Sequence, residues 1–235
     1  MQAAIMSEPS PSREPLPGTV KLYGRHLFLC TGAADWPAHI EEDGGLAQAL
    51  NQAIQARSQA LAVPVKLTAC DAPSAGPGLD LLIFPDRIRY LGLTEAEFPV
   101  LIDDHLVGDR ISSRLRWEAA PGSFIFVCTH AARDARCGEC GPPLIQRLAA
   151  ELIARELSEA VYLHRSSHVG GHKYAGNVLL YPPGDWYGYV APADAPRLVQ
   201  QAVLDGQIVA DLWRGRMGLS PDEALRLAGA RSAGP

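Results

Sequence analysis

The sequence predicts an α/β protein that consists of two similar halves. Apolar runs typical of buried strands alternate with segments whose apolar residues recur at helical spacing. Two pairs of segments also match at nearly one offset, because LFLCT at 27–31 resembles IFVCT at 125–129, and LLIFP at 81–85 resembles VLLYP at 178–182. Since both matches occur in the same order, about 97 residues apart, we infer an internal duplication.

The expected elements follow in the same order in each half. The four apolar runs predict buried strands at 27–30, 81–84, 125–129 and 178–181. Between the two strands of each half, apolar residues repeat at helical spacing and predict amphipathic helices over 44–58 and 142–157. Pro142 and Pro143 suit a first helical turn, where a missing N–H group does little harm. This order predicts a small α/β sandwich in each half.

The predicted boundaries divide the chain into a leader and two repeats. Residues 1–20 are rich in Pro, Ser and Glu and have no apolar core, so we expect a disordered leader. The first repeat is predicted over 21–111 and the second over 112–235, with 112–122 as the connection between them.

The composition is that of a globular protein with a sizeable core, and it excludes several classes. Of the 235 residues, 47% are hydrophobic and 20% are charged, and the net charge of −5 speaks against a nucleic-acid binder with a basic surface. The sequence has no run of about 18 apolar residues that would span a membrane, and its first residues lack the apolar core of a secretory signal. We therefore expect a cytoplasmic protein whose five cysteines are metal ligands, redox groups or core residues rather than disulfides.

The residues that point to chemistry lie in the second half. Cys128 ends an apolar strand, and Cys137 and Cys140 follow in a glycine-rich stretch that we expect to be a loop. Further along the chain, His168 and His172 flank Gly170 and Gly171. These glycines permit close approach of the backbone to a bound group. Two thiolates and two imidazoles form a four-ligand set that suits zinc or an iron–sulfur cluster. Cys140 remains an alternative to Cys137 as a ligand.

Five motifs, FIFVCTH, DARCGECGP, SHVGGHKYAGNVLLYP, WYG and LWRGRMG, together resemble the sucrase/ferredoxin-like family over about 123–218. Members of this family resemble ferredoxins of thioredoxin fold, so the resemblance implies two tandem thioredoxin-like repeats. It also implies a [2Fe–2S] cluster outside the Rieske fold, held by Cys128, Cys137, His168 and His172. Around these ligands we expect Gly170, Gly171, Lys173 and Asn177 to contact or tune the cluster.

The first half departs from this ligand pattern. It has Cys30 at the position of Cys128 and Cys70 near the position of His168, but no counterpart to Cys137 or His172. We therefore expect a degenerate first repeat and one cluster per chain. The two repeats would form an internal pseudo-dimer, which makes a monomer sufficient.

The expected function is one-electron transfer between donor and acceptor proteins that the sequence does not identify. The protein is expected to be a carrier rather than an enzyme with its own substrate pocket. Exposed imidazole ligands would couple reduction to protonation, so that the potential falls as pH rises. Two alternatives remain open. One is a structural zinc domain built on Cys137, Cys140, His168 and His172, and the other is a thiol–disulfide oxidoreductase that uses the Cys137–Cys140 pair.

Overall fold

The computed structural model describes residues 13–42, 44–74 and 76–232. Its strands are β1 (Arg25–Cys30), β2 (Val65–Cys70), β3 (Leu79–Phe84), β4 (Ile88–Leu93), β5 (Trp117–Ala119), β6 (Ser123–Cys128), β7 (Val161–Ser166), β8 (Val178–Tyr181), β9 (Asp185–Tyr187) and β10 (Trp213–Arg216). Its helices are α1 (Gly45–Ala56), α2 (Phe98–Leu101), α3 (Ala135–Ala154), α4 (Ala195–Leu198) and α5 (Pro221–Ser232), and π-helical turns at Ile102–Val107 and Val199–Leu204 extend α2 and α4.

The strands of the described part form one mixed sheet in the order β10-β9-β8-β6-β7-β2-β1-β3-β4-β5. In the first half, β1 pairs parallel with β2 and antiparallel with β3, which pairs antiparallel with β4. In the second half, β6 pairs parallel with β7 and antiparallel with β8, which pairs antiparallel with β9. The two half-sheets, β1–β5 and β6–β10, meet where Cys70 of β2 pairs with Ser166 of β7.

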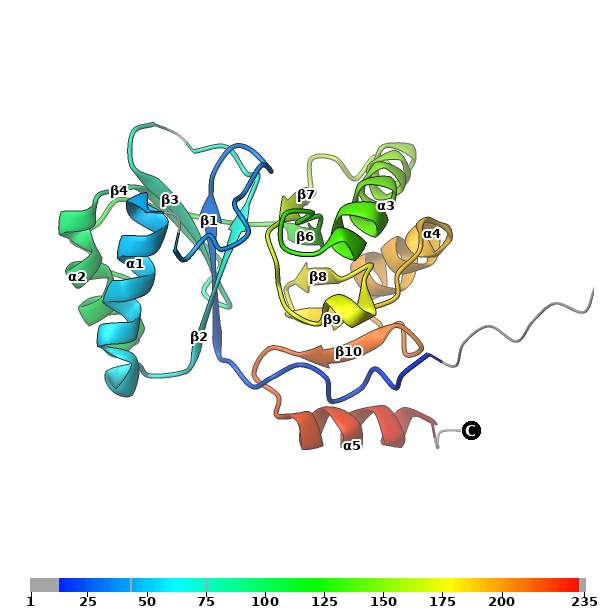
Figure 1. The fold of residues 1–235 in the computed structure, drawn as a ribbon. Coiled ribbons are helices and arrows are strands. Elements are labelled where there is room, and N and C mark those ends of the chain that lie inside the picture. Colours follow the sequence, from blue (N-terminus) through cyan, green and yellow to red (C-terminus); the bar gives the residue numbers. More distant parts are fainter. Residues whose placement is uncertain (1–12, 43, 75, 233–235) are drawn as a thin grey trace, which may run out of the picture.

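Helices cover the outer faces of the two half-sheets. Figure 1 shows α1 and α2 on one side of the strands and α3 and α4 on the other. Alternate strand residues pack against these helices, with Leu27 in one helix-facing core and Ile125 in the other. The remaining strand residues form a central core that both halves share, where the rings of Phe28 and Phe126 stack with centroids 3.7 Å apart. Because both faces of β1, β3 and β8 are covered, these strands are buried along their whole length, as continuous apolar runs predict.

The helix predicted over 142–157 begins earlier, at Ala135. Asp134 caps it, because its carboxylate accepts a hydrogen bond from the Arg136 N–H group at 3.0 Å. Pro142 and Pro143 therefore lie inside α3 rather than in its first turn. The prediction was wrong because it took the prolines as the start signal and overlooked the cap. As a consequence, Cys137 and Cys140 belong to the first turns of α3 and not to a loop.

Two predicted boundaries also change. The expected disordered leader is wrong for its last residues, because Leu16 and Val20 are buried, Val20 in the central core, while 1–12 lie outside the described residues. The expected connection over 112–122 contains β5, which pairs with β4 and so extends the first half-sheet. Sequence periodicity could not reveal either feature, since a short segment acquires its burial from the surface on which it packs.

Within the described residues, the structure contains no helix that is both long enough and apolar enough to cross a membrane.

Candidate metal centre

The site begins where two parallel strands end side by side. Cys128 is the last residue of β6 and pairs in register with Ser166, the last residue of β7. Two residues after β7 comes His168. Because the carboxyl ends of parallel strands lie at the same edge of a sheet, Cys128 and His168 come together although 40 residues separate them in the sequence. The Cys128 side chain is almost fully buried, with the residue 1% exposed.

The start of α3 brings the second cysteine to this edge. Gly141 lies so close to β6 that a Cβ atom there would be 2.5 Å from the carbonyl oxygen of Cys128. Gly138 packs equally closely on Ala131, where a Cβ atom would lie 2.5 Å from the Ala131 Cβ. These two glycines let the first turns of α3 lie against the strand end, which buries Cys137 beside Cys128.

Three of the four predicted ligands converge. The Sγ atoms of Cys128 and Cys137 and a ring nitrogen of His168 all lie within 4.8 Å of one another. His168 Nδ1 is buried and has no hydrogen-bond partner among the described residues. A buried nitrogen without a partner is costly, and the ring also brings one of its nitrogens to the two thiols, as a metal ligand would. The chemistry of this donor set therefore fits a zinc ion or an iron–sulfur cluster.

The fourth predicted ligand, His172, lies next to this group but outside it. The rings of His168 and His172 have centroids 5.6 Å apart, and His172 Nδ1 lies 3.5 Å from the carboxylate of Asp134. The alternate ligand Cys140 is exposed and does not belong to the converging group. Cys140 lies almost one turn beyond Cys137 on α3, and its side chain is exposed whereas that of Cys137 is buried.

The electrostatics of the cysteine pair are those of a site ready for a cation. Hydrogen bonds from the Cys137 thiol and from His168 hold the pKa of Cys128 well below its ordinary value, in spite of burial. The backbone N–H groups of His130 and Val169 act in the same direction. The Cys128 thiolate in turn raises the pKa of Cys137, and burial adds to the rise. The surroundings thus stabilise Cys128 as a thiolate.

Residues around the ligands hold the loop that carries both histidines, the histidine loop (167–177). Asn177 donates a hydrogen bond to the Gly171 carbonyl oxygen at 3.1 Å and accepts one from Arg214 at 2.6 Å. Both Gly170 and Gly171 have positive φ, at 93° and 72°, and a Cβ atom at 171 would collide with the Arg214 guanidinium. Lys173 is exposed and pairs with Glu14, and its expected influence on the cluster stays a prediction.

Two residues that sequence reasoning did not assign hold the site together. His130 accepts a hydrogen bond from the His168 N–H group at 3.0 Å, and its other ring nitrogen lies 2.9 Å from the Pro37 carbonyl oxygen in the first half. Arg214 of β10 fixes Asn177, as described above. The Trp-Arg-Gly-Arg string was a signal for Arg214, but nothing in the sequence shows that the arginine is buried.

The first half has no matching site among the residues that the structure describes. Cys30 pairs in register with Cys70 across β1 and β2, as Cys128 does with Ser166. Cys70 therefore corresponds to Ser166 and not to the predicted His168. The other group of potential ligands in this part of the chain, His39, Glu41 and Glu42, is exposed.

Comparisons with known proteins agree with the motif analysis. In Clavispora lusitaniae, "Altered inheritance of mitochondria protein 32" is 38% identical over 95 residues, which cover 39% of this chain and 34% of that protein. The protein of the same name in Saccharomyces cerevisiae strain YJM789 is 31% identical over 127 residues, 49% of this chain and 39% of that protein. The match thus spans little more than a third of the length of these curated relatives.

Among solved structures, the wild-type thioredoxin-like [2Fe–2S] ferredoxin from Aquifex aeolicus superposes with a TM-score of 0.38 at 20% identity. The superposition covers 41% of this chain and all of the ferredoxin chain. The profile of a known family matches a far larger part of the sequence, residues 16–215, and includes every residue of the converging group. This chain therefore belongs to the sucrase/ferredoxin-like family.

Proposed function

We propose that this protein is a one-electron carrier whose cofactor is a [2Fe–2S] cluster held by Cys128, Cys137, His168 and His172. The observation that carries the proposal is the convergence of two buried thiols and a ring nitrogen of His168 within 4.8 Å. Such a cluster, when bound, accepts and releases a single electron.

The position of His172 supports a group with more than one metal ion. A single tetrahedral ion draws its ligand atoms into one small group, whereas the ligands of a two-iron cluster are divided between two centres. His172 lies beside His168 but outside the group of Cys128, Cys137 and His168. The residue is exposed, so its ring can turn toward a second iron without moving the core.

The chain contributes the ligands and their surroundings. Neutral imidazole ligands place less negative charge on the cluster than thiolates do, and this favours its reduced state. In Rieske centres, histidine ligation corresponds to reduction potentials of about −150 to +300 mV, against about −400 mV in plant-type ferredoxins. Burial of Cys128 and Cys137 excludes water from the thiolate side, whereas exposed His172 leaves a short route to a partner protein. The coupling of reduction to protonation, expected from the sequence, remains a prediction.

The two halves support an origin by duplication. The paired strands follow one order in both halves, and the π-helical turns Ile102–Val107 and Val199–Leu204 occupy matching places after α2 and α4. We propose that the halves form an internal pseudo-dimer about the Phe28–Phe126 stack, so that a monomer is sufficient. Unidentified electron donor and acceptor proteins and a cytoplasmic location remain predictions.

The test is to purify the protein anaerobically and to measure iron, acid-labile sulfide, zinc and visible absorption before and after dithionite. We expect iron and sulfide in equal amounts and colour that bleaches on reduction. Cys137→Ser should abolish the colour, and Cys140→Ser is the matched control that should retain it because Cys140 is exposed. Colourless protein with stoichiometric zinc, or loss of iron in the Cys140 variant alone, would overturn the proposal.

The two alternatives have less support. A zinc site that includes Cys140 requires that exposed thiol to enter a group from which the structure separates it. A thioredoxin-type mechanism needs an accessible cysteine of low pKa at the helix start, but here Cys137 is buried and its pKa is raised.

A further inference from the structure

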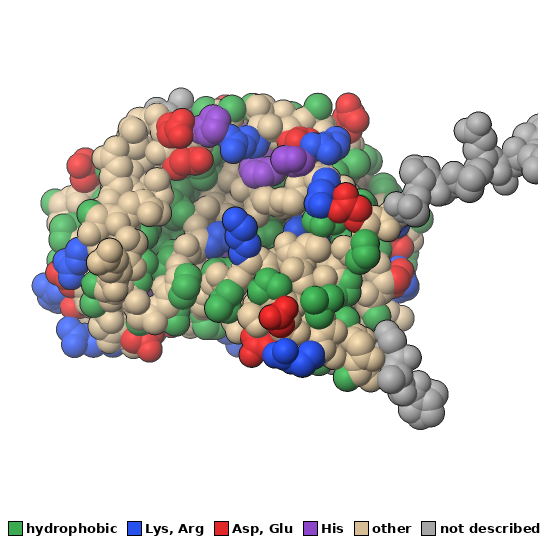
Figure 2. All heavy atoms as spheres, turned by 60° about the horizontal axis from the view of Figure 1, so that its bottom comes forward, with side chains coloured by type: hydrophobic (Ala, Val, Ile, Leu, Met, Phe, Trp, Pro, Cys, Tyr) green, Lys and Arg blue, Asp and Glu red, His purple; other side chains and the backbone are tan. Residues whose placement is uncertain are grey.

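A cavity of about 590 Å³ lies next to the histidine loop. Its walls come from the segment 19–23, the start of β2, the histidine loop, β9 and β10. Figure 2 shows the hollowed face of the molecule, where basic and histidine side chains lie next to hydrophobic ones. The sequence predicted a carrier without a substrate pocket, so this cavity has no place in the function proposed above.

The charge of the cavity is entirely positive. Four cationic side chains line it: Lys21, Lys66, Lys173 and Arg214. Its described lining residues include no Asp or Glu. Lys173 is paired with Glu14 at the rim, which leaves three cations without a carboxylate in this part of the wall. This is an unusual concentration in a chain whose net charge is −5.

Two of these cations converge on one aromatic ring. The Lys66 Nζ atom lies 5.4 Å and the Arg214 Cζ atom 5.5 Å from the ring centroid of Trp186, which forms the floor of the cavity. Lys66 has no hydrogen bond or ion pair among the described residues. Every acceptor that Arg214 uses there is neutral: the Thr19 hydroxyl, the Asn177 amide and two backbone carbonyls. Arg214 is buried and Lys66 is half-buried. Because buried cations are normally paired, the pair offers a place for an anion.

The walls between the cations are apolar. The cavity is lined here by Val20, Tyr23, Val169, Tyr174 and Trp186. An inorganic ion would leave these surfaces facing water, whereas an organic anion would cover them and gain from their burial. We propose that the cavity binds a small organic carboxylate with a flat apolar body, its carboxylate between Lys66 and Arg214 and its body on the apolar walls.

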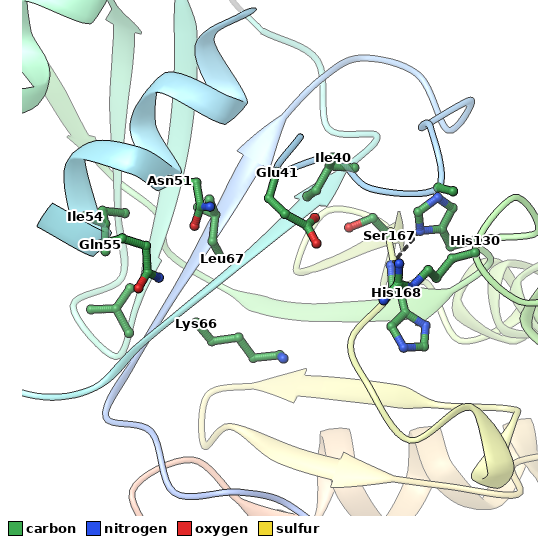
Figure 3. Close-up of a pocket in the computed structure, with 13 residues that line it drawn as sticks. Ile40, Glu41, Asn51, Ile54, Gln55, Lys66, Leu67, His130, Ser167 and His168 are labelled. Carbon is green, nitrogen blue, oxygen red and sulfur yellow. Dashed lines mark hydrogen bonds between the residues drawn. The ribbon is translucent and has the colours of Figure 1, made fainter. Parts of the chain in front are cut away.

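The negative charge of the Cys128 thiolate raises the pKa of both Lys66 and Arg214, but within the described residues neither cation forms an ion pair. Lys66 comes from β2 of the first half and lines both this cavity and a second one that His168 borders, where Figure 3 shows it extending from its strand with its ammonium group free of the residues drawn. Burial lowers the pKa of Lys66 to about 8, and repulsion by Arg214 adds to this effect. These effects disfavour the charged form of Lys66. If nothing bound in the cavity, we would expect this flexible side chain to extend into solvent.

The test uses the as-purified protein and isothermal titration calorimetry with 2-naphthoate as the probe. We expect saturable binding of one 2-naphthoate per chain, and binding at least about tenfold weaker for 2-naphthamide, the neutral compound of the same shape. Lys66→Gln should weaken 2-naphthoate binding by about tenfold or more, and Lys66→Arg, which retains the charge, should restore most of it. Arg116→Gln is the matched control: it removes one exposed cation near the far edge of the sheet and should leave binding unchanged.

Three results would overturn the proposal. One is equal affinity for 2-naphthoate and 2-naphthamide in the unaltered protein, which needs no variant and so does not depend on folding. Another is equal affinity of the Lys66→Gln and unaltered proteins for 2-naphthoate. The third is absence of 2-naphthoate binding while a poly-glutamate peptide binds in a Lys66-dependent way, which would show that the face serves an acidic protein. None of these readouts depends on the cluster, so the electron-carrier proposal stands or falls separately.

Discussion

The close approach of α3 to β6 predicts that Gly141→Ala will loosen the metal centre although glycine carries no ligand atom. The new Cβ atom would lie 2.5 Å from the Cys128 carbonyl oxygen, 2.8 Å from Thr129 Cγ2 and 3.0 Å from Thr129 Cα. Two of these neighbours are backbone atoms, so the helix must move rather than a side chain. Such overpacking costs about 1–3 kcal/mol, while alanine in a helix gains about 1 kcal/mol over glycine.

We therefore expect the variant to lose up to about 2 kcal/mol of unfolding free energy. For a chain of this length that corresponds to a fall in Tm of up to about 8 °C. Displacement of α3 also moves Cys137 away from Cys128, so the iron content of the purified variant should fall with its stability. Thermal unfolding followed by circular dichroism, together with an iron assay, measures both effects.

Gly229→Ala is the matched control for this experiment. Gly229 lies in α5, and a Cβ atom there would meet nothing within 4 Å. The control variant should gain up to about 1 kcal/mol from helix propensity and keep its iron. If Gly141→Ala is as stable as Gly229→Ala and retains a full complement of iron, the close approach does not position Cys137 and the reasoning fails.

Two further predictions concern the scaffold. Phe28→Ala removes one ring of the stack with Phe126 that joins the two halves. The free energy of unfolding, measured in urea, should fall by about 3–5 kcal/mol. A loss under about 1 kcal/mol would show that the halves do not depend on this contact. Burial raises the pKa of Asp86, but the adjacent His105 ring, whose Nε2 lies 3.3 Å from the carboxylate, and the hydrogen bonds from Arg25 outweigh it and hold that pKa far below its ordinary value. The ionised carboxylate therefore stabilises the fold above the unfolded-state pKa of about 4, and this contribution is lost as pH falls through the folded-state pKa. In urea unfolding from pH 7 to pH 2, the stability difference between the unaltered protein and Asp86→Asn should be constant above about pH 5 and shrink below about pH 4; a difference that does not change with pH would contradict this assignment.

The sequence was sufficient for features that depend on local pattern. Continuous apolar runs predicted the buried strands around Leu27 and Ile125, because a strand covered on both faces has no polar side to display. The soft donors among so many glycines predicted a metal site, and the family resemblance selected Cys128, Cys137, His168 and His172 as its ligands, which stays a prediction. The start of α3 was predicted wrongly, because two prolines outweighed the weaker signal of Asp134 as a cap.

Tertiary structure alone decided which of those residues meet and what surrounds them. The parallel register of β6 and β7 sets Cys128 beside His168, whereas the early helix start buries Cys137 and leaves Cys140 exposed. Lys66 reaches the second half from a strand about 100 residues earlier, and no periodicity in the chain records that encounter. The physical reason is the same in each case. Hydrophobic pattern and spacing are properties of neighbouring residues, while contact, burial and charge environment depend on how separate segments pack.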